Sequence, residues 1–336
     1  MSLKGKKVLV TGGAGFIGSY LVRELLKVGA EVIVYDNLFS GDQENLKEIE
    51  EQILLIRGDI RDREFVKILK EHKVEYVYNL AAEPYIPYSY ERPWSFVEIN
   101  TMGALNVFLA CKEAGVKRII QYSTSEVYGK ARYLPMDEEH PTYPLSTYAV
   151  SKLAADRLAF TLHHEIGLPV IILRQFNCYG PRVTQPYVIP EIISQLSRGN
   201  RLKLGNLKAR RDLTFVEDAA RGAVMLMECE DAVGEVINVG SEENYSVEEL
   251  AHIIGKLMGH KEIKIEVDKN RLRPLDVEVL LCNPEKMRKL TGWEPRVSLE
   301  EGLRIMIDYY YSHGKRWLWE KKLVPEEKIW KKPSIK

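Results

Sequence analysis

The sequence has few cysteines, no excess of either charge and no long apolar run. Its four cysteines, Cys111, Cys178, Cys229 and Cys282, lie far apart and form no Cys-x-x-Cys pair. This spacing gives no sign of a zinc site or of a disulfide framework, and it favours a reducing, cytoplasmic compartment. We expect no bound metal.

The balance of charge and the lack of long apolar segments exclude two classes of partner. The chain has 48 Lys and Arg residues against 48 Asp and Glu residues, whereas a dedicated nucleic-acid-binding protein shows a basic excess. No apolar run approaches the ~18 residues that a membrane span needs, and the N-terminal segment does not resemble a signal peptide. We therefore expect a soluble protein that binds neither nucleic acid nor membrane.

The first half of the chain alternates between short apolar runs and segments of helical spacing. Alternation of this kind predicts right-handed crossovers and a parallel sheet with helices on both faces. After Gly180-Pro181 the pattern loosens into two short helices between charged loops. The predicted fold class is α/β, a doubly wound parallel (Rossmann) sheet with a smaller C-terminal lobe. Strands are expected at 8–10, 32–35, 53–56, 74–80, 118–123 and 170–173, and helices at 16–27, 64–70, 95–114, 147–165, 188–196 and 247–257.

A glycine-rich turn, TGGAGFIG at 11–18, follows the first predicted strand. Gly12, Gly15 and Gly18 would let the backbone turn tightly and approach a pyrophosphate at the start of the next helix. Asp36 ends the second predicted strand, where its carboxylate would accept hydrogen bonds from the adenosine ribose and repel the extra phosphate of NADP. Because Asn37 rather than an arginine follows it, we expect NAD as the cofactor.

A tyrosine and a lysine, Tyr148 and Lys152, begin the predicted helix 147–165. Their spacing of four places both side chains on one face of the helix. A free tyrosine has a pKa near 10, so general-base catalysis near pH 7 requires a pKa lower by about three, which corresponds to roughly 4 kcal/mol. A lysine ammonium and a nicotinium cation close to the phenol would supply this stabilisation of the phenolate.

Together with these two motifs, the strings GDIRD, NLAAE, STSEVYG, RQFNCYGPR, RRDLTFVEDAARG and GWEP resemble the extended short-chain dehydrogenase/reductase family, in its branch acting on nucleotide-diphosphate sugars. The resemblance covers roughly residues 5–310. It implies that Thr124 hydrogen-bonds the sugar C4 oxygen, that Tyr148 takes its proton and that Lys152 holds the nicotinamide ribose. One departure is Asn79, where many relatives carry histidine.

The same resemblance implies further ligand contacts and a division of labour along the chain. Residues 1–180 would form the NAD-binding domain, 181–315 mainly the substrate lobe and 316–336 a tail. A tail helix would pack Trp317, Trp319 and Trp330 on the body. Implied cofactor contacts are Phe16, Ile17, Asp36, Asn37, Asp59, Ile60, Leu80, Ala81, Ala82, Asn100 and Ser123. Implied substrate contacts are Glu83, Thr124, Asn177, Arg211 and Arg273, with Asn177 and the two arginines on the diphosphate.

The dipeptide Ser125-Glu126 bears on which reaction follows C4 oxidation. A 4,6-dehydratase needs a base to remove the C5 proton and an acid to help expel the C6 hydroxyl, and relatives acting on simple hexoses usually show Asp-Glu at this place. Here Glu126 would be the base, while Ser125 could relay a proton or position a water. Alternatively, Glu126 is a structural carboxylate bonded to the backbone or to an arginine.

The STSE string resembles both nucleotide-glucuronate decarboxylases and 4,6-dehydratases acting on nucleotide-linked N-acetylglucosamine. The strings LGNLKARRDLTFVEDAARG, GEVINVGS and RLRPLDVEV are more similar to the latter. We therefore expect an NAD-dependent nucleotide-sugar 4,6-dehydratase. Three alternatives stay open: a 4-epimerase of the UDP-glucose or UDP-N-acetylglucosamine type, a UDP-glucuronate decarboxylase, and a non-catalytic NAD-binding protein.

The family resemblance also implies a homodimer, in which helices 95–114 and 147–165 of two subunits form a four-helix bundle. The centre of such an interface would have to be apolar. Five residues of these helices are candidates for that centre, although they could equally pack inward: Ala104, Leu105, Phe108, Leu153 and Phe160.

Overall fold

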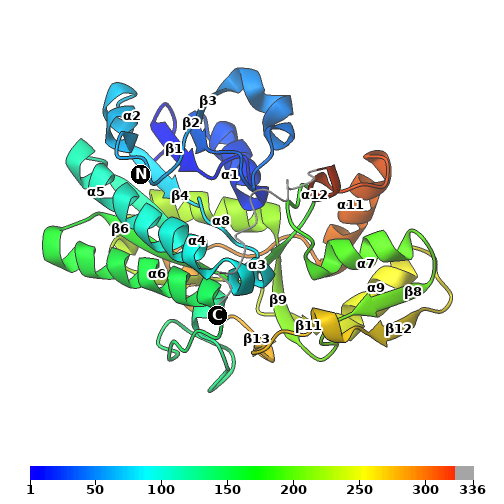
Figure 1. Ribbon diagram of the computed structural model, residues 1–336. Helices are drawn as coiled ribbons and strands as arrows, with labels where there is room; N and C mark the ends of the chain where they lie inside the picture. Colours follow the sequence, from blue (N-terminus) through cyan, green and yellow to red (C-terminus); the bar gives the residue numbers. More distant parts are fainter. Residues whose placement is uncertain (322–336) are drawn as a thin grey trace, which may run out of the picture.

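A seven-stranded parallel sheet forms the centre of the computed structural model, which describes residues 1–321 (Figure 1). The strand order β10-β6-β5-β4-β1-β2-β3 reverses direction between β4 and β1, as in a doubly wound fold. The predicted parallel sheet is therefore confirmed. Its strands are β1 (Lys7–Thr11), β2 (Glu31–Asp36), β3 (Ile53–Arg57), β4 (Tyr76–Asn79), β5 (Arg118–Thr124), β6 (Val170–Gln175) and β10 (Val236–Val239).

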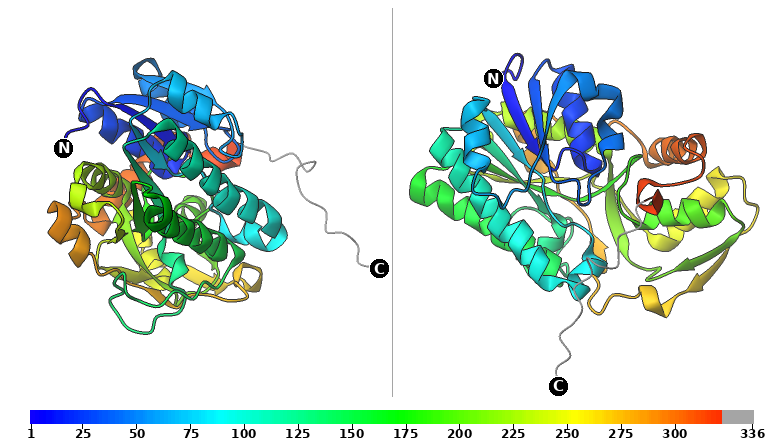
Figure 2. Two further views of the ribbon diagram at one scale, coloured as in Figure 1. Left: turned by 90° about the vertical axis from the view of Figure 1, so that its left-hand side faces the viewer. Right: turned by 45° about the horizontal axis from the view of Figure 1, so that its top comes forward.

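Helices cover both faces of this sheet, which explains why its inner strands are continuous apolar runs rather than alternating ones. On one face lie α1 (Phe16–Lys27), α8 (Val216–Glu228) and the 3₁₀ segment η1 (Gln43–Gln52). On the other lie α2 (Phe65–Glu71), α5 (Ala104–Ala114) and α6 (Thr147–Ile166), with α5 and α6 side by side (Figures 1 and 2). Two short helices, α3 (Ile86–Glu91) and α4 (Pro93–Val97), precede α5.

The predicted helix 95–114 contains a local irregularity that the sequence pattern did not reveal. Between α4 and α5 the chain forms a π-helical turn, η2 (Glu98–Gly103). Asn100 lies in this turn and is buried, and its amide donates to Glu83 O at 3.1 Å and to Ser151 Oγ at 3.0 Å. The π turn thus ties the segment after β4 to α6, in keeping with the frequent occurrence of such turns at functional sites.

The smaller lobe is built from the second half of the chain (Figure 1). The predicted helices α7 (Val188–Leu196) and α9 (Val247–Leu257) have the predicted bounds. Strand β10 and helix α8 also come from this half, yet they belong to the central sheet and its cover. The lobe's strands are β7 (Asn177–Tyr179), β8 (Arg201–Leu204), β9 (Arg210–Phe215), β11 (Asn244–Ser246), β12 (Lys264–Val267) and β13 (Val279–Leu280), and its other helices are α10 (Glu285–Thr291), α11 (Leu299–Ser312) and α12 (Leu318–Lys321).

The end of the described chain packs against α7. Trp317 is buried, and its Nε1 donates to Pro190 O at 3.1 Å. The Trp319 ring stacks on it with a centroid separation of 5.5 Å. The prediction that tail tryptophans pack on the body is thus confirmed for these two, while Trp330 lies outside the described residues.

No helix within residues 1–321 has the length and apolar character needed to cross a membrane.

Candidate functional site

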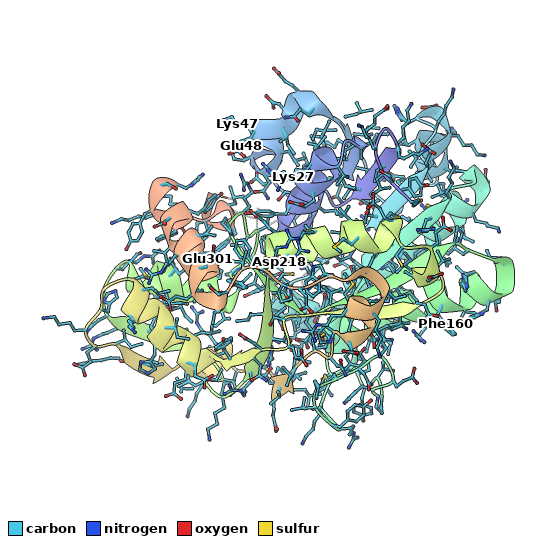
Figure 3. The ribbon with its side chains drawn as sticks, turned by 180° about the vertical axis from the view of Figure 1, so that it is seen from behind. Lys27, Lys47, Glu48, Phe160, Asp218 and Glu301 are labelled. Carbon is cyan, nitrogen blue, oxygen red and sulfur yellow. The ribbon has the colours of Figure 1, made fainter. Side chains whose placement is uncertain are left out.

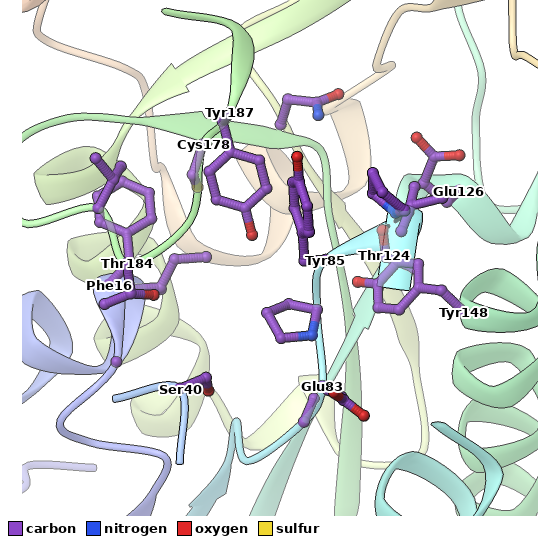
Figure 4. Close-up of a pocket in the computed structure, with 18 of the residues that line it drawn as sticks. Phe16, Ser40, Glu83, Tyr85, Thr124, Glu126, Tyr148, Cys178, Thr184 and Tyr187 are labelled. Carbon is purple, nitrogen blue, oxygen red and sulfur yellow. Dashed lines mark hydrogen bonds between the residues drawn. The ribbon is translucent and has the colours of Figure 1, made fainter. Parts of the chain in front are cut away.

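A cleft of about 960 Å³ lies at the carboxyl ends of the central strands, between the sheet and the smaller lobe (Figure 4). Residues that follow β1, β2, β4, β5 and β6 line one part of it, and the start of α7 with segments 204–211 and 270–276 lines the rest. In open α/β sheets, ligands bind in this crevice, where the strand order reverses. The fold therefore brings the predicted site residues, with the exception of Asn100, to one place.

The glycine turn leaves no room for side chains. Gly12 has φ +70°, and a Cβ there would lie 2.8 Å from Ala81 N. A Cβ on Gly18 would overlap Gly12 O, and Gly15 directly precedes α1. The backbone can therefore approach a ligand at the start of a helix, where a pyrophosphate is stabilised by unpaired N–H groups.

Asp36 ends β2 inside the cleft and is 6% exposed. Its Oδ2 accepts from Ala14 N at 3.0 Å and its Oδ1 from Leu38 N at 2.8 Å. These bonds fix the carboxylate at the end of β2. The geometry fits the dinucleotide expected from the sequence.

The residues predicted to contact adenine, together with Asn37, form a small polar cluster. Asn37 Nδ2 donates to Asp59 Oδ2 at 2.9 Å, and Arg61 forms an ion pair with Asp59 at 2.8 Å. The hydrogen bond from Arg61 is the main cause that lowers the pKa of Asp59 to about 2. Ile60, beside them, is buried and lines the cleft. Phe16 and Ile17 line it from α1.

On the nicotinamide side, Leu80, Ala81, Ala82 and Ser123 all line the cleft. Asn100, predicted as a cofactor contact, is not among its lining residues and instead holds the backbone of Glu83, accepting from Glu83 N at 2.8 Å. The hydroxyl of Ser123 is buried without a hydrogen-bond partner in the described chain, as are Gln175 Oε1 and Asn177 Oδ1. A polar ligand would satisfy these groups.

Thr124, Tyr148 and Lys152 meet where β5 ends against the start of α6. Thr124 caps the 3₁₀ turn η3 (Ser125–Val127), since its Oγ1 accepts from Glu126 N at 3.3 Å. Burial raises the pKa of Tyr148 to about 12; a hydrogen bond with Thr124 opposes this shift and the charge of Glu126 adds to it. Burial also lowers the pKa of Lys152 to about 8, against the attraction of Asp156. With a pKa of about 12, the Tyr148 phenol is protonated at neutral pH.

A buried chain of hydrogen bonds connects the glycine turn to Lys152. Thr11, Asn79 and Gln121 are register neighbours on β1, β4 and β5. Thr11 Oγ1 donates to Asn79 Oδ1 at 2.7 Å, and Asn79 Nδ2 donates to Gln121 Oε1 at 2.7 Å. Gln121 Nε2 then donates to Tyr122 O at 2.9 Å, the same oxygen that accepts from Lys152 Nζ at 2.6 Å. Asn79, the departure noted in the sequence, thus belongs to a satisfied network.

Glu126 follows Thr124 in the wall of the cleft, on the same side as Tyr148 (Figure 4). It is 8% exposed, and its Oε1 lies 4.0 Å from Arg273 Nη1. Within residues 1–321, the carboxylate makes no hydrogen bond, so its contact with Arg273 is a loose ion pair. Ser125, beside it, is 2% exposed and also lines the cleft.

The predicted substrate residues lie along the same cleft. Asn177 and Arg211 line it from β7 and β9, and Arg273 from the segment before β13. Glu83 is buried and paired, with Arg92 Nη2 at 3.0 Å from one carboxylate oxygen and the Ser95 hydroxyl donating to the other.

Sequence reasoning missed several residues of the cleft. Tyr85 and Tyr187 stand in its centre with ring centroids 6.0 Å apart (Figure 4), and Asp276 pairs with Arg211 at 3.2 Å. The available signal for Asp276 was an acidic residue three positions after Arg273, close enough in the sequence to form an ion pair with it. No sequence pattern pointed to Tyr85 or Tyr187. Gln121, of the hydrogen-bond chain described above, was also missed, although a polar residue within an apolar strand was a signal for it.

Asp212, next to Arg211 in β9, is fully buried and supports the substrate side of the cleft. Its two carboxylate oxygens accept from Ser241 N, Ser241 Oγ, Glu242 N and Cys282 N at 2.7–3.1 Å. Burial nevertheless raises the pKa of Asp212 to about 6, against the effect of these hydrogen bonds.

Replacement of Asp212 by asparagine is expected to change the pH dependence of stability. The folded state holds the Asp212 proton more tightly than the unfolded state, whose Asp pKa is about 3.9, so this stabilisation is complete below that value and lost as the pH rises to about 6. The wild type should therefore lose stability relative to Asp212→Asn between pH 4 and 6. Urea unfolding of both proteins across that range measures the difference, and a constant difference would contradict the expectation.

Comparisons with known proteins agree with this geometry. The family model described as GDP-mannose 4,6 dehydratase matches residues 9–306. A UDP-glucuronate 4-epimerase of Thermodesulfobacterium geofontis is 33% identical over 313 residues, covering 90% of this chain and 95% of that protein. A UDP-N-acetyl-alpha-D-glucosaminuronate decarboxylase of Bacillus cytotoxicus is 33% identical over 318 residues, covering 91% and 98%.

Among solved structures, the dTDP-glucose 4,6-dehydratase of Streptomyces venezuelae, crystallised with NAD and TYD bound, is similar to this chain with a TM-score of 0.86. It is 30% identical, and the match covers 93% of this chain and 99% of that one. These proteins share a fold, while their names differ in the reaction.

Proposed function

Because the chain belongs to the NAD-dependent, nucleotide-sugar-modifying branch of the extended short-chain dehydrogenase/reductase family, we propose that it is a nucleotide-sugar 4,6-dehydratase. NAD is its cofactor, and the proposed substrate is a nucleotide-diphospho-hexose or N-acetylhexosamine. The observation that carries the proposal is the position of Glu126, a carboxylate without hydrogen bonds in the described chain, in the cleft wall beside Thr124 and Tyr148.

The first step is proposed to be oxidation at C4 of the sugar. NAD, when bound, accepts the C4 hydride and later returns it to C6. Thr124 would hold the C4 oxygen while Tyr148 takes its proton, and Lys152 would hold the nicotinamide ribose. The positive charge of the oxidised cofactor would lower the pKa of Tyr148 from its value of about 12. Gly12, Gly15, Gly18, Asp36 and Asp59 are proposed to position the rest of the cofactor.

The second step is proposed to depend on Glu126. Oxidation at C4 acidifies the neighbouring C5–H bond. Glu126 would take that proton, and a proton relayed through Ser125 or a water would go to the C6 hydroxyl, which leaves as water. Return of hydride to C6 would then be matched by return of the proton from Glu126 to C5. Ser125 would orient the leaving hydroxyl or a water. The alternative, that Glu126 is a structural carboxylate bonded to the backbone or to an arginine, has little support. Within residues 1–321, Arg273 is the one charged neighbour within 4.0 Å of Glu126, and it forms no hydrogen bond with it. Asn177, Arg211 and Arg273 are proposed to bind the diphosphate, and Glu83 to border the sugar.

Replacement of Glu126 by glutamine is expected to stop the reaction after C4 oxidation. The amide keeps the shape of the side chain but cannot take a proton, so turnover should fall about 100-fold, the ordinary contribution of a general base. Mass spectrometry of products from UDP-N-acetylglucosamine, GDP-N-acetylglucosamine, dTDP-glucose, UDP-glucose and UDP-glucuronate provides the test. Loss of one water by the wild-type protein, with bound NADH accumulating in Glu126→Gln, is the expected pair of results.

Other outcomes of this panel would replace the proposal. Loss of carbon dioxide from UDP-glucuronate would show a decarboxylase, and an unchanged mass with a new chromatographic peak would show a 4-epimerase. Near-normal turnover of Glu126→Gln would show that Glu126 is not the C5 base, and the observation that carries the proposal would be lost. No turnover of any donor would favour a non-catalytic NAD-binding protein.

A homodimer is proposed on the outer faces of α4, α5 and α6. Ala104 and Phe108 are buried and pack inward, Leu105 and Leu153 are half-buried, and Phe160 lies on the outer side of α6 (Figure 3). The same face carries other exposed apolar side chains, and such a patch is typical of an interaction surface. They are Trp94, Val97, Met102, Leu109 and Val150.

Replacement of Leu109 by glutamate is expected to weaken this dimer about 100-fold, because the charge would be buried unpaired at the centre of the interface. Sedimentation velocity over a range of concentrations measures the effect. Val267→Glu, at an exposed position of β12 in the smaller lobe, is the matched control and should leave the dimer intact. A Leu109→Glu protein as dimeric as the control would place the interface elsewhere.

Residues 1–180 are proposed to serve mainly the cofactor and 181–315 mainly the substrate, although β10 and α8 complete the central sheet. A cytoplasmic location is proposed because the four cysteines are unpaired thiols.

A further inference from the structure

Four charged side chains meet in one wall of the cleft: Glu126, Arg211, Arg273 and Asp276. Arg273 Nη1 lies 4.0 Å from Glu126 Oε1 and 3.8 Å from Asp276 Oδ1. Arg211 Nη2 lies 3.2 Å from the same Asp276 oxygen. Asp276 thus stands between the two arginines, and Glu126 is the second anion near Arg273.

Two members of this cluster are firmly held. Arg211 donates to Arg210 O at 2.9 Å and to Val277 O at 2.8 Å, and its side chain is 12% exposed. Asp276 Oδ2 accepts from Asn206 Nδ2 at 2.9 Å. Arg211 and Asp276 are therefore fixed before any ligand arrives.

Arg273 is held more loosely. Its two ion-pair distances exceed hydrogen-bond length, and its side chain is 33% exposed. A long arginine side chain in such a position can turn toward a stronger anion at small cost. Diphosphate is such an anion, because the planar guanidinium fork matches phosphate oxygens.

The charges of the cluster cancel while the cleft lacks substrate, with two arginines opposite two carboxylates. A diphosphate adds about two negative charges, so Arg273 cannot serve all of these anions equally. Tyr90 of α3 faces the same group: burial raises its pKa, the charge of Arg273 lowers it, and the charges of Glu126 and Asp276 raise it. The charges of Arg273 and Arg271 also act on Tyr85. These phenols offer no additional cation.

We propose that Arg273 binds Glu126 and the diphosphate of the substrate in turn. Without substrate, Arg273 holds the Glu126 carboxylate toward the arginine cluster. When the nucleotide sugar binds, its diphosphate takes Arg273, and Glu126 is released to reach the sugar. Asp276 is a positioning residue that keeps Arg211 in place during this exchange. The inference rests on the proposed diphosphate role of Arg211 and Arg273, and its link to catalysis rests on Glu126 as the base.

The exchange has a consequence for affinity that a purely structural role of Glu126 would not produce. Because Glu126 and the diphosphate compete for Arg273, removing the charge of Glu126 should make a sugar-free nucleoside diphosphate bind more tightly. Isothermal titration of the NAD-saturated protein with UDP, dTDP and GDP measures this, and the tightest ligand is used for the variants. Saturation with NAD keeps the nucleotide out of the cofactor's own pyrophosphate site.

We expect Glu126→Gln to bind this nucleotide about threefold to tenfold more tightly than the wild type, the scale of a partly exposed ion pair. Glu91→Gln removes a charge from another residue of the cleft lining and should change the affinity less than twofold. In an Arg273→Ala background the gain from Glu126→Gln should disappear, since the two effects are coupled through one side chain.

Equal or weaker binding by Glu126→Gln would overturn the inference. A gain that persists without Arg273 would also overturn it, because the gain would then reflect only the general loss of negative charge. Failure of all three nucleotides to bind the wild type would remove the diphosphate site itself. Turnover of Glu126→Gln is a separate measurement: normal turnover would remove the proposed role of Glu126 as the C5 base, while the competition for Arg273 could still hold.

Discussion

Replacement of Tyr148 by phenylalanine is expected to lower kcat by a factor of about 10³ to 10⁴, toward the upper range for a lost general acid or base. Tyr148 lines the cleft and its phenol oxygen hydrogen-bonds with Thr124, while Lys152 follows on the same face of α6. Phenylalanine keeps the ring and its edge contact with Phe96 at a centroid distance of 6.3 Å, so folding should be preserved.

The measurement for Tyr148→Phe is single-turnover formation of NADH on the protein, which isolates C4 oxidation from all later steps. Tyr143→Phe is the matched control, because Tyr143 is 64% exposed and does not line the cleft; it should react at the wild-type rate. Substrate affinity should change little, since only one hydroxyl is removed. An NADH burst in Tyr148→Phe as fast as in the control would assign the proton transfer to a different group.

Replacement of Arg174 by methionine is expected to destabilise the protein by about 3–5 kcal/mol, the cost of leaving one member of a buried ion pair alone. Arg174 and Asp156 are 3% and 0% exposed, and Arg174 Nε donates to Asp156 Oδ2 at 2.9 Å. Arg174 Nη1 also donates to Tyr128 Oη at 3.0 Å, and Arg174 Cζ lies over the Tyr128 ring, 4.9 Å from its centroid. Methionine would leave the Asp156 carboxylate in an apolar interior with less compensation.

Chemical denaturation of Arg174→Met gives the free energy of unfolding directly. Arg157→Met is the matched control: Arg157 also pairs with Asp156, but its side chain is 43% exposed, so its loss should cost less than about 1 kcal/mol. The double variant Asp156→Leu/Arg174→Met should be more stable than Arg174→Met alone, because it leaves no unpaired charge. A double variant less stable than Arg174→Met would contradict this, because it would show that Asp156 stabilises the fold even without Arg174.

The buried pair also bears on the site. Asp156 lies one helical turn after Lys152, and its charge opposes the lowering of the Lys152 pKa to about 8. Tyr128, which Arg174 contacts, directly follows the turn that carries Glu126. Loss of this ion pair should therefore disturb both the start of α6, which carries Lys152, and the η3 turn, which carries Glu126.

Local sequence patterns were enough to predict the first six strands of the central sheet, the two lobe helices and the glycine turn. Each depends on neighbouring residues only: apolar runs for β1 and β6, glycine spacing for the turn, and helical spacing for α7 and α9. The π turn at Asn100 was not predictable in this way. The Asn100 side chain hydrogen-bonds with Glu83 and Ser151, which are distant from it in the sequence. For the same reason, the pattern after Gly180 did not show that β10 returns to the central sheet.

Site residues differ in the same respect. Asp36, Tyr148 and Lys152 were recognisable because their positions are set within one strand–helix unit. The chain Thr11–Asn79–Gln121 depends on the register of three strands, and the cluster of Glu126 with Arg273 and Asp276 depends on how the two parts of the chain pack. Sequence spacing carries no information on either.

The contact of Trp317 with Pro190 implies an order of assembly during synthesis on the ribosome. The start of α7 lines the cleft, and Trp317, near the end of the described chain, packs against this helix. The strands that carry the glycine turn, Asp36 and Thr124 emerge more than a hundred residues earlier, and domains fold as their sequence becomes available. The glycine turn, Asp36 and Thr124 are therefore synthesised well before the residues that complete the packing of α7.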